Sequence, residues 1–244
     1  MSTENNWMTC NLDQRFKNPF VDFKVIFNPT SFKKISFEQA SIESATKIAN
    51  KYDNLYLGLS GGLDSEYVCK VFLKLGIPFE PIVVKTPGNT LELSFANYFI
   101  KQNNLKPVII QKNEGDMLIT YYEKILNISG YGDNSTATYI AGQYAEDNGG
   151  IFVMAEHLID DRDDGSIKIG ANEWDFYNDC LINEQNTHYF FNYTPSIAYS
   201  MVSEVTDDED AQEYKTRIYN VGFRPKMMYE FSEKYKEGLK KLRM

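Results

Sequence analysis

Apolar and polar residues form a repeating pattern along residues 36–155 that predicts strands and helices in alternation. Short apolar runs predict buried strands at 55–59, 81–85, 107–111 and 151–155. Apolar residues at helical spacing predict helices at 36–51, 67–75, 89–103, 116–128 and 135–146. Strands that alternate with helices favour parallel βαβ units. We therefore expect an α/β fold with a doubly wound, mainly parallel sheet and helices on both faces.

The N-terminal segment has a weaker pattern. Residues 1–17 are polar, so we expect them to be loosely ordered. Residues 21–27 alternate in part and predict a short strand that ends at Asn28-Pro29. Ser36, with Gln39 three residues later, predicts a capping box at the start of the first helix.

The segment after the first strand of the alternating region reads Ser60-Gly61-Gly62-Leu63-Asp64-Ser65. Two glycines permit positive φ and let the backbone approach an anion closely. The N–H groups and dipole of the following helix favour negative charge. Ser60 and Ser65 add hydroxyl donors, and Asp64 suits a phosphate site if Mg²⁺ lies between them. The alternative is a purely structural turn between strand and helix.

A second polar cluster follows the strand at 151–155. One Glu and four Asp occur within nine residues, namely Glu156, Asp160, Asp161, Asp163 and Asp164. The EF-hand pattern fails, because Arg162 and Ala171 occupy the third and twelfth positions of the loop. The cluster is either a metal site or a solvated acidic loop, and the second interpretation is better for Asp163 and Asp164.

The two histidines have different surroundings in the sequence. His157 lies within the acidic cluster, where it either contacts substrate or simply ends the strand. His188 lies in an aromatic stretch, so we expect a structural role. Asn89 opens the helix after the second strand of the alternating region, and a helix cap is its simplest role.

Composition narrows the class of protein. The 244-residue chain is 43% hydrophobic and 14% aromatic, which predicts a packed core. The formal net charge of −9 argues against nucleic acid as the substrate, since such binding depends on clustered Lys and Arg. Three widely spaced cysteines without a Cys-x-x-Cys pair support neither a zinc site nor a disulfide framework. We expect a cytoplasmic protein that does not enter a membrane.

Residues 60–65 resemble the pyrophosphate-binding loop, Ser-Gly-Gly-x-Asp-Ser, of the N-type ATP pyrophosphatases, the PP-loop superfamily. The resemblance extends to asparagine-synthetase-like and phage-encoded members. It implies an adenine nucleotide alpha hydrolase-like fold. It also implies a nucleotide-binding domain over 36–170, after an N-terminal extension over 1–35. Residues 171–244 would form a small C-terminal helical extension that faces the substrate. If the protein is phage-encoded, the host cytoplasm is its expected location.

The resemblance assigns roles to residues of this chain. Asp64 would bind Mg²⁺ together with Asp160 or Asp161, because Glu156-His157 with these two aspartates resembles a Gly-His-x-x-x-Asp-Asp element. Here Ala155-Glu156 replaces Thr-Gly, which puts the shape of that loop in question. The nucleotide would contact Gly58, Leu59, Ser60, Gly61, Gly62, Leu63, Asp64, Ser65, Val84, Lys85, Glu156 and His157. Asn89-Thr90-Leu91-Glu92 also resembles an Asn-x-x-Glu segment of phage-encoded members, where it borders the nucleotide site. Catalytic roles fall on Asp64 and on three cations of the C-terminal region, Lys215, Arg224 and Lys226.

The implied reaction cleaves ATP to AMP and pyrophosphate. A carboxylate or carbonyl oxygen would be adenylated and then attacked by ammonia or an amine. The cofactors would be ATP and Mg²⁺, and the partners a small-molecule or peptide acceptor with free ammonia or a separate glutaminase. Three alternatives stay open: a sulfur-transfer enzyme, a nucleic-acid-modifying enzyme and a non-catalytic ATP-binding protein. The sequence leaves the oligomeric state undecided.

Overall fold

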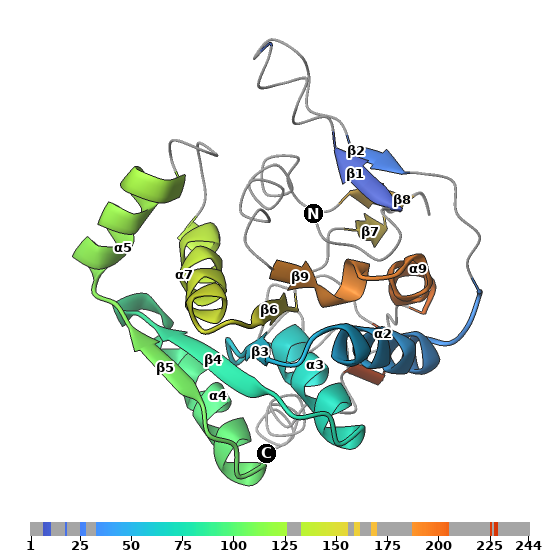
Figure 1. Ribbon diagram of the computed structural model, residues 1–244, viewed down its shortest axis with the longest axis horizontal. Helices are drawn as coiled ribbons and strands as arrows, with labels where there is room; N and C mark the ends of the chain where they lie inside the picture. The colour runs from blue at the N-terminus through green and yellow to red at the C-terminus, as the bar shows by residue number, and fades with distance from the viewer. Residues whose placement is uncertain are drawn as a thin grey trace, which may run out of the picture.

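The computed structural model describes residues 7–10, 18, 25–27, 33–125, 133–155, 159–161, 167–169, 187–204, 225, 227 and 228. Its centre is a five-stranded parallel sheet (Figure 1). The strands are β3 (Leu55–Gly58), β4 (Glu80–Lys85), β5 (Val108–Gln111), β6 (Ile151–Met154) and β9 (Thr187–Tyr189). This arrangement confirms the expected α/β class.

The order of strands across the sheet is β5-β4-β3-β6-β9. The chain therefore builds outward from β3 in one direction and then returns to its other side with β6. The pairing Leu57↔Val153 joins these two central strands. In open α/β sheets of this kind, ligands bind beyond the carboxyl ends of the strands at the point where the order reverses. That point is the end of β3, where residues 59–62 follow.

Helices cover both faces of the sheet, as expected for a doubly wound fold. On one face, Leu57, Val83 and Val153 pack against α2 (Phe37–Lys51), α3 (Leu63–Lys74) and α4 (Thr90–Gln102). On the other, Phe152 and Met154 pack against α7 (Asp133–Asp147), with α5 (Glu114–Thr120) beside it (Figure 1). Alternate side chains of one strand thus enter two different hydrophobic cores.

The helix boundaries follow local sequence signals closely. Ser36 is the N-cap of α2, and its hydroxyl accepts from the backbone N–H of Gln39. The Gln39 side chain donates to Glu43 instead of returning to Ser36, so only half of the expected capping box forms. The helix expected at 116–128 begins earlier as α5 and continues in a π-helical turn, η3 (Tyr121–Ile125).

Four strands were not expected from the sequence. Met8–Cys10 (β1) pairs antiparallel with Val25–Phe27 (β2), and Trp7 is buried, so part of the N-terminal segment is ordered. Ile159–Asp161 (β7) pairs antiparallel with Ile167–Ile169 (β8), so Asp160 and Asp161 lie on a strand. Strand β9 adds a fifth strand from the region after residue 170.

The segment that follows β9 joins the core. A short 3-10 turn, η4 (Phe190–Asn192), leads into α9 (Pro195–Ser203), which lies against α2 (Figure 1). Glu204, just after α9, accepts a hydrogen bond at 2.8 Å from the backbone N–H of Phe37 and so caps α2 from a distant part of the chain. Within the described part of the chain, no helix combines the length and apolarity needed to cross a membrane.

Candidate functional site

The loop between β3 and α3 is held together by its two serines. Ser65 Oγ accepts from the backbone N–H of Ser60 at 3.2 Å, lies 3.1 Å from Ser60 Oγ, and donates to the carbonyl of Gly62 at 3.1 Å. Ser60 Oγ accepts from the N–H of Gly62 at 3.2 Å. Because the Ser65 hydroxyl proton is donated to the carbonyl of Gly62, the Ser60 hydroxyl is the donor in its contact with Ser65 Oγ. Both hydroxyl protons and the N–H groups of Ser60 and Gly62 are then used inside the loop, so the backbone N–H groups of the first turn of α3 are the better candidates for anion donors.

The start of α3 places its positive end at this loop. Gly62 is the N-cap residue and makes no side-chain capping bond, since glycine has no side chain. The uncapped N-terminus of a helix favours negative charge through its N–H groups and its dipole. Asp64 lies in this first turn and is partly exposed. The chemistry of this donor set fits a phosphate with its metal ion.

Gly61 brings the loop into contact with the helix after the next strand. Its φ is +88°, which glycine adopts without penalty. A Cβ at residue 61 would overlap the carbonyl oxygen of Glu92 and lie 3.2 Å from the backbone nitrogen of Ala96. The sequence suggested glycine for the approach of a phosphate. The structure shows a second reason, the close packing of the loop on the first turns of α4.

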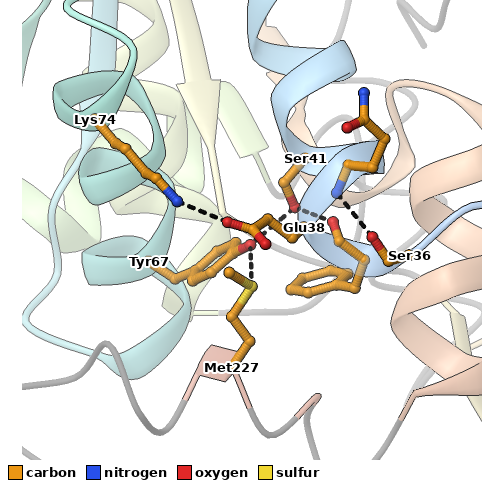
Figure 2. A network of polar contacts seen from close by, with 8 residues as sticks. Ser36, Glu38, Ser41, Tyr67, Lys74 and Met227 are labelled. Carbon is orange, nitrogen blue, oxygen red and sulfur yellow. Dashed lines mark hydrogen bonds and ion pairs between the residues drawn. The ribbon is translucent and has the colours of Figure 1, made fainter.

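A buried tyrosine of α3, Tyr67, joins this helix to α2 (Figure 2). Tyr67 donates to Ser41 Oγ at 3.0 Å, and Ser41 donates to the carbonyl of Phe37 at 2.7 Å, which joins α3 to α2. The Tyr67 hydroxyl also contacts Met227 Sδ at 3.6 Å, so the described residues near the C-terminus dock against the same helix. Burial raises the pKa of Tyr67 well above its usual value, with smaller contributions from Glu38 and Glu204.

Another set of contacts joins α3 to α4. Glu66, buried in the first turn of α3, forms an ion pair with Lys70 at 3.2 Å. The Lys70 ammonium lies 5.9 Å from the centre of the Phe99 ring on α4. Cys69 lies on the same helix, fully buried, and burial raises the pKa of its thiol. A buried thiol of this kind is unreactive, which agrees with the absence of a cysteine pattern in the sequence.

The end of β4 forms the neighbouring wall of the site. The N–H of Leu59 donates to the backbone carbonyl of Ile82, and the N–H of Lys112 donates to the backbone carbonyl of Lys85. Backbone groups of successive strand residues point to opposite sides, so the groups of Val84 face the β3 side and those of Lys85 face β5. The last register pair between β3 and β4 is Gly58↔Ile82. The backbone of Val84 therefore lies beyond the end of β3, at the carboxyl edge that carries the loop.

Asn89 occupies this edge with its side chain. Its Oδ1 accepts from the N–H of Thr86 at 2.9 Å, and its Nδ2 donates to the carbonyl of Val84 at 2.8 Å. Asn89 is the N-cap residue of α4 but makes no side-chain capping bond to that helix. The predicted cap position of Asn89 is thus confirmed, but its side-chain amide closes the preceding turn, η2 (Pro87–Asn89), and does not bond the helix.

The structure describes only part of the predicted metal site. Asp160 and Asp161 lie on β7, beside α9, and their side chains fall outside the described residues. Glu156, His157, Lys215, Arg224 and Lys226 also fall outside the described residues. Among the side chains that are described, no three acidic, histidine or cysteine groups gather as metal ligands. The predicted roles of these seven residues therefore stay predictions.

His188 takes the structural position that its aromatic surroundings suggested. It is buried in β9, with its ring 4.9 Å from that of Tyr52 and 5.6 Å from that of Tyr193. Two site relationships could not be read from the sequence, namely Gly61 with Glu92 and Asn89 with Val84. The residue types gave a hint in each case, since a glycine pair and an Asn after Pro-Gly are both typical of tight turns.

Comparison of the sequence with protein-family models and with curated proteins gives no match. Among solved structures, the chain is similar to an NMN synthetase from Francisella tularensis, with 18% identity, a TM-score of 0.40 and coverage of 51% of this chain and 56% of that one. It is also similar to an NH3-dependent NAD synthetase from Campylobacter jejuni (19% identity, TM-score 0.39, 50% and 58% coverage). A third is a predicted subunit of tRNA methyltransferase from Methanocaldococcus jannaschii (15%, 0.36, 68% and 88%).

The matched region spans little more than half the length of the two synthetases. At these values, the neighbours do not assign an activity to the chain. An activity is therefore inferred from the chemistry of residues 60–65 and from their place where the order of strands reverses.

Proposed function

We propose that the protein is an ATP-using enzyme that binds ATP and Mg²⁺ at residues 60–65 and cleaves the bond between the α and β phosphates. The supporting observation is the pre-formed loop of Ser60, Gly61 and Gly62 at the open N-terminus of α3. This position is the reversal point of a parallel sheet, where such folds bind nucleotides. Asp64 follows the loop directly and supplies a carboxylate on the same turn.

The chain's own residues have separate tasks in this proposal. Backbone N–H groups of the first turn of α3 bind the leaving pyrophosphate. Asp64, together with Asp160 or Asp161, holds Mg²⁺, which neutralises phosphate charge when bound. Lys215, Arg224 and Lys226 supply further positive charge near the phosphates. Val84 and Lys85, at the end of β4, border the base, and Glu156 and His157 contact the nucleotide.

The reaction itself needs positioning more than covalent catalysis. An acceptor carboxylate or carbonyl oxygen attacks the α-phosphorus, a new P–O bond forms, and the bond to the β-phosphate oxygen breaks. Pyrophosphate leaves with that electron pair. Ammonia or an amine then attacks the activated carbon, loses a proton, and displaces AMP. The acceptor is a small molecule or a peptide, since a chain of net charge −9 repels a polyanion.

Product analysis tests this proposal. ATP, Mg²⁺ and pools of carboxylic acids are incubated with the protein, and AMP, ADP, phosphate and pyrophosphate are separated. Exchange of labelled pyrophosphate into ATP identifies the acid that is adenylated, because this step is reversible. AMP and pyrophosphate support the proposal, whereas ADP and phosphate contradict it. Binding without turnover under any pool would favour a non-catalytic ATP-binding protein.

A further inference from the structure

The carboxamide of Asn89 presents a donor and an acceptor side by side to the end of β4. The donor binds the carbonyl of Val84 at 2.8 Å, and the acceptor binds the N–H of Thr86 at 2.9 Å. The 6-amino group and N1 of adenine carry the same pair, a donor next to an acceptor. Asn89 therefore satisfies the backbone groups that an adenine edge would otherwise use.

The location makes this likeness relevant to the nucleotide. Val84 faces the β3 side of β4, beyond the last register pair Gly58↔Ile82, at the edge that carries the phosphate loop. The same short connection leads into α4, whose residue Glu92 touches Gly61 in that loop. A base attached to phosphates bound at residues 60–65 would have this strand end within its surroundings.

We propose that Asn89 is a specificity-determining residue that competes with the 6-amino group of a purine nucleotide for the carbonyl of Val84. The inference rests on the proposed ATP site. While Asn89 holds this carbonyl, the 6-amino group contributes little to binding, and the preference for adenine over other purines is weak. Removal of the amide donor frees the carbonyl and lets the protein read the 6-amino group.

Two substitutions separate this role from a structural one. Asn89→Asp keeps the acceptor for the Thr86 N–H but removes the donor to Val84, so it preserves part of the turn. Asn89→Ala removes both bonds. The control is Thr90→Ala, because the exposed Thr90 hydroxyl donates to the Pro87 carbonyl in the same turn without touching Val84.

The experiment compares two nucleotides by calorimetric titration in the presence of Mg²⁺. One is ATP, and the other is purine riboside 5′-triphosphate, which lacks only the 6-amino group. For the wild type and Thr90→Ala we expect affinities within about twofold of each other. For Asn89→Asp and Asn89→Ala we expect ATP to bind about fivefold more tightly than purine riboside 5′-triphosphate, which is the effect of one neutral hydrogen bond.

Equal ratios of the two affinities in the wild type and in both Asn89 variants would overturn the inference while leaving the ATP site intact. A wild type that already binds ATP about fivefold more tightly than purine riboside 5′-triphosphate would also overturn it. A wild type that binds neither nucleotide would refute the proposed function, and the inference with it. Circular dichroism of each variant shows whether the fold is retained, and Asn89→Asp gives the decisive ratio if Asn89→Ala unfolds.

Discussion

Gly61 lies against the carbonyl oxygen of Glu92, so closely that no side chain fits between the loop after β3 and the first turn of α4. This contact joins two connections that leave neighbouring strands at the same edge of the sheet. It places the candidate phosphate loop and the end of β4 in one structural unit. Substitutions at residue 61 should therefore disturb both the fold and the site.

We expect Gly61→Ala to reduce the free energy of unfolding by about 2–4 kcal/mol, from backbone strain at positive φ and from overlap with Glu92. The melting temperature should fall by roughly 5–15 °C, as measured by thermal unfolding. Two matched variants separate the causes. Gly76 has a φ of +66° in open space, so Gly76→Ala should show the strain alone, about 1–2 kcal/mol. Gly88→Ala has neither problem and should be neutral. Equal stability of the Gly61 and Gly88 variants would contradict the packing argument.

Ser65 organises the phosphate loop through three contacts, with Ser60 N–H, Ser60 Oγ and the carbonyl of Gly62. We expect Ser65→Ala to weaken ATP binding at least fivefold and to cost about 1–2 kcal/mol of stability, because a buried acceptor is lost. Titration calorimetry and chemical unfolding measure the two effects. Ser203→Ala removes an exposed serine that also donates to a backbone carbonyl, and it should change neither. Unchanged ATP affinity in Ser65→Ala would show that the loop does not depend on this side chain.

Tyr67 should make the folded protein less stable as the pH rises above ~10. Because burial raises its pKa in the folded protein above the ordinary value of about 10, the folded state favours the neutral hydroxyl. This stabilisation is fully present below pH ~10 and is lost as the pH rises through the folded-state pKa. In Tyr67→Phe, the decline of stability above pH ~10 should be shallower, and stability at pH 7 should be about 1 kcal/mol lower.

The control for Tyr67→Phe lies in the same group of contacts (Figure 2). Lys74 and Glu38 form an ion pair at 2.6 Å whose side chains are 54% and 46% exposed, and exposed pairs contribute little. Lys74→Met should stay within about 0.5 kcal/mol of the wild type, with the same alkaline decline. A larger effect from Lys74→Met than from Tyr67→Phe would reverse the assignment of the buried tyrosine as the main link between α2 and α3.

Much of the fold could be predicted because its strands are short apolar runs followed by helical spacing. The strands at Leu55–Gly58 and Ile151–Met154 read clearly, since both are buried on both faces. Thr187–Tyr189 was missed because a strand of three residues with polar Thr and His gives no apolar run, although all three side chains are buried. The antiparallel pair of Ile159–Asp161 with Ile167–Ile169 is also not predicted. The alternation Ile167-Lys168-Ile169 was its available signal.

The site divides in the same way. Residues 60–65 could be found in the sequence because the glycines, serines and aspartate are contiguous and local chemistry defines the loop. The contacts of Gly61 with Glu92 and of Tyr67 with Ser41 join residues 26 or more positions apart, so they depend on packing that no local pattern contains. Asn89 was assigned to the wrong partner, because a turn and a helix begin at almost the same place and both accept an Asn cap.

Titration of ATP with Mg²⁺ into the wild type and into Asp64→Asn tests the central claim most directly. The exposed Asp53, just before β3, provides the matched control in Asp53→Asn. We expect the wild type and Asp53→Asn to bind ATP equally, and more tightly with Mg²⁺ than without it. Asp64→Asn should bind at least tenfold more weakly in Mg²⁺ and should lose most of the metal dependence, because a carboxylate ligand is absent. Equal affinity and equal metal dependence in the wild type and Asp64→Asn would contradict the account.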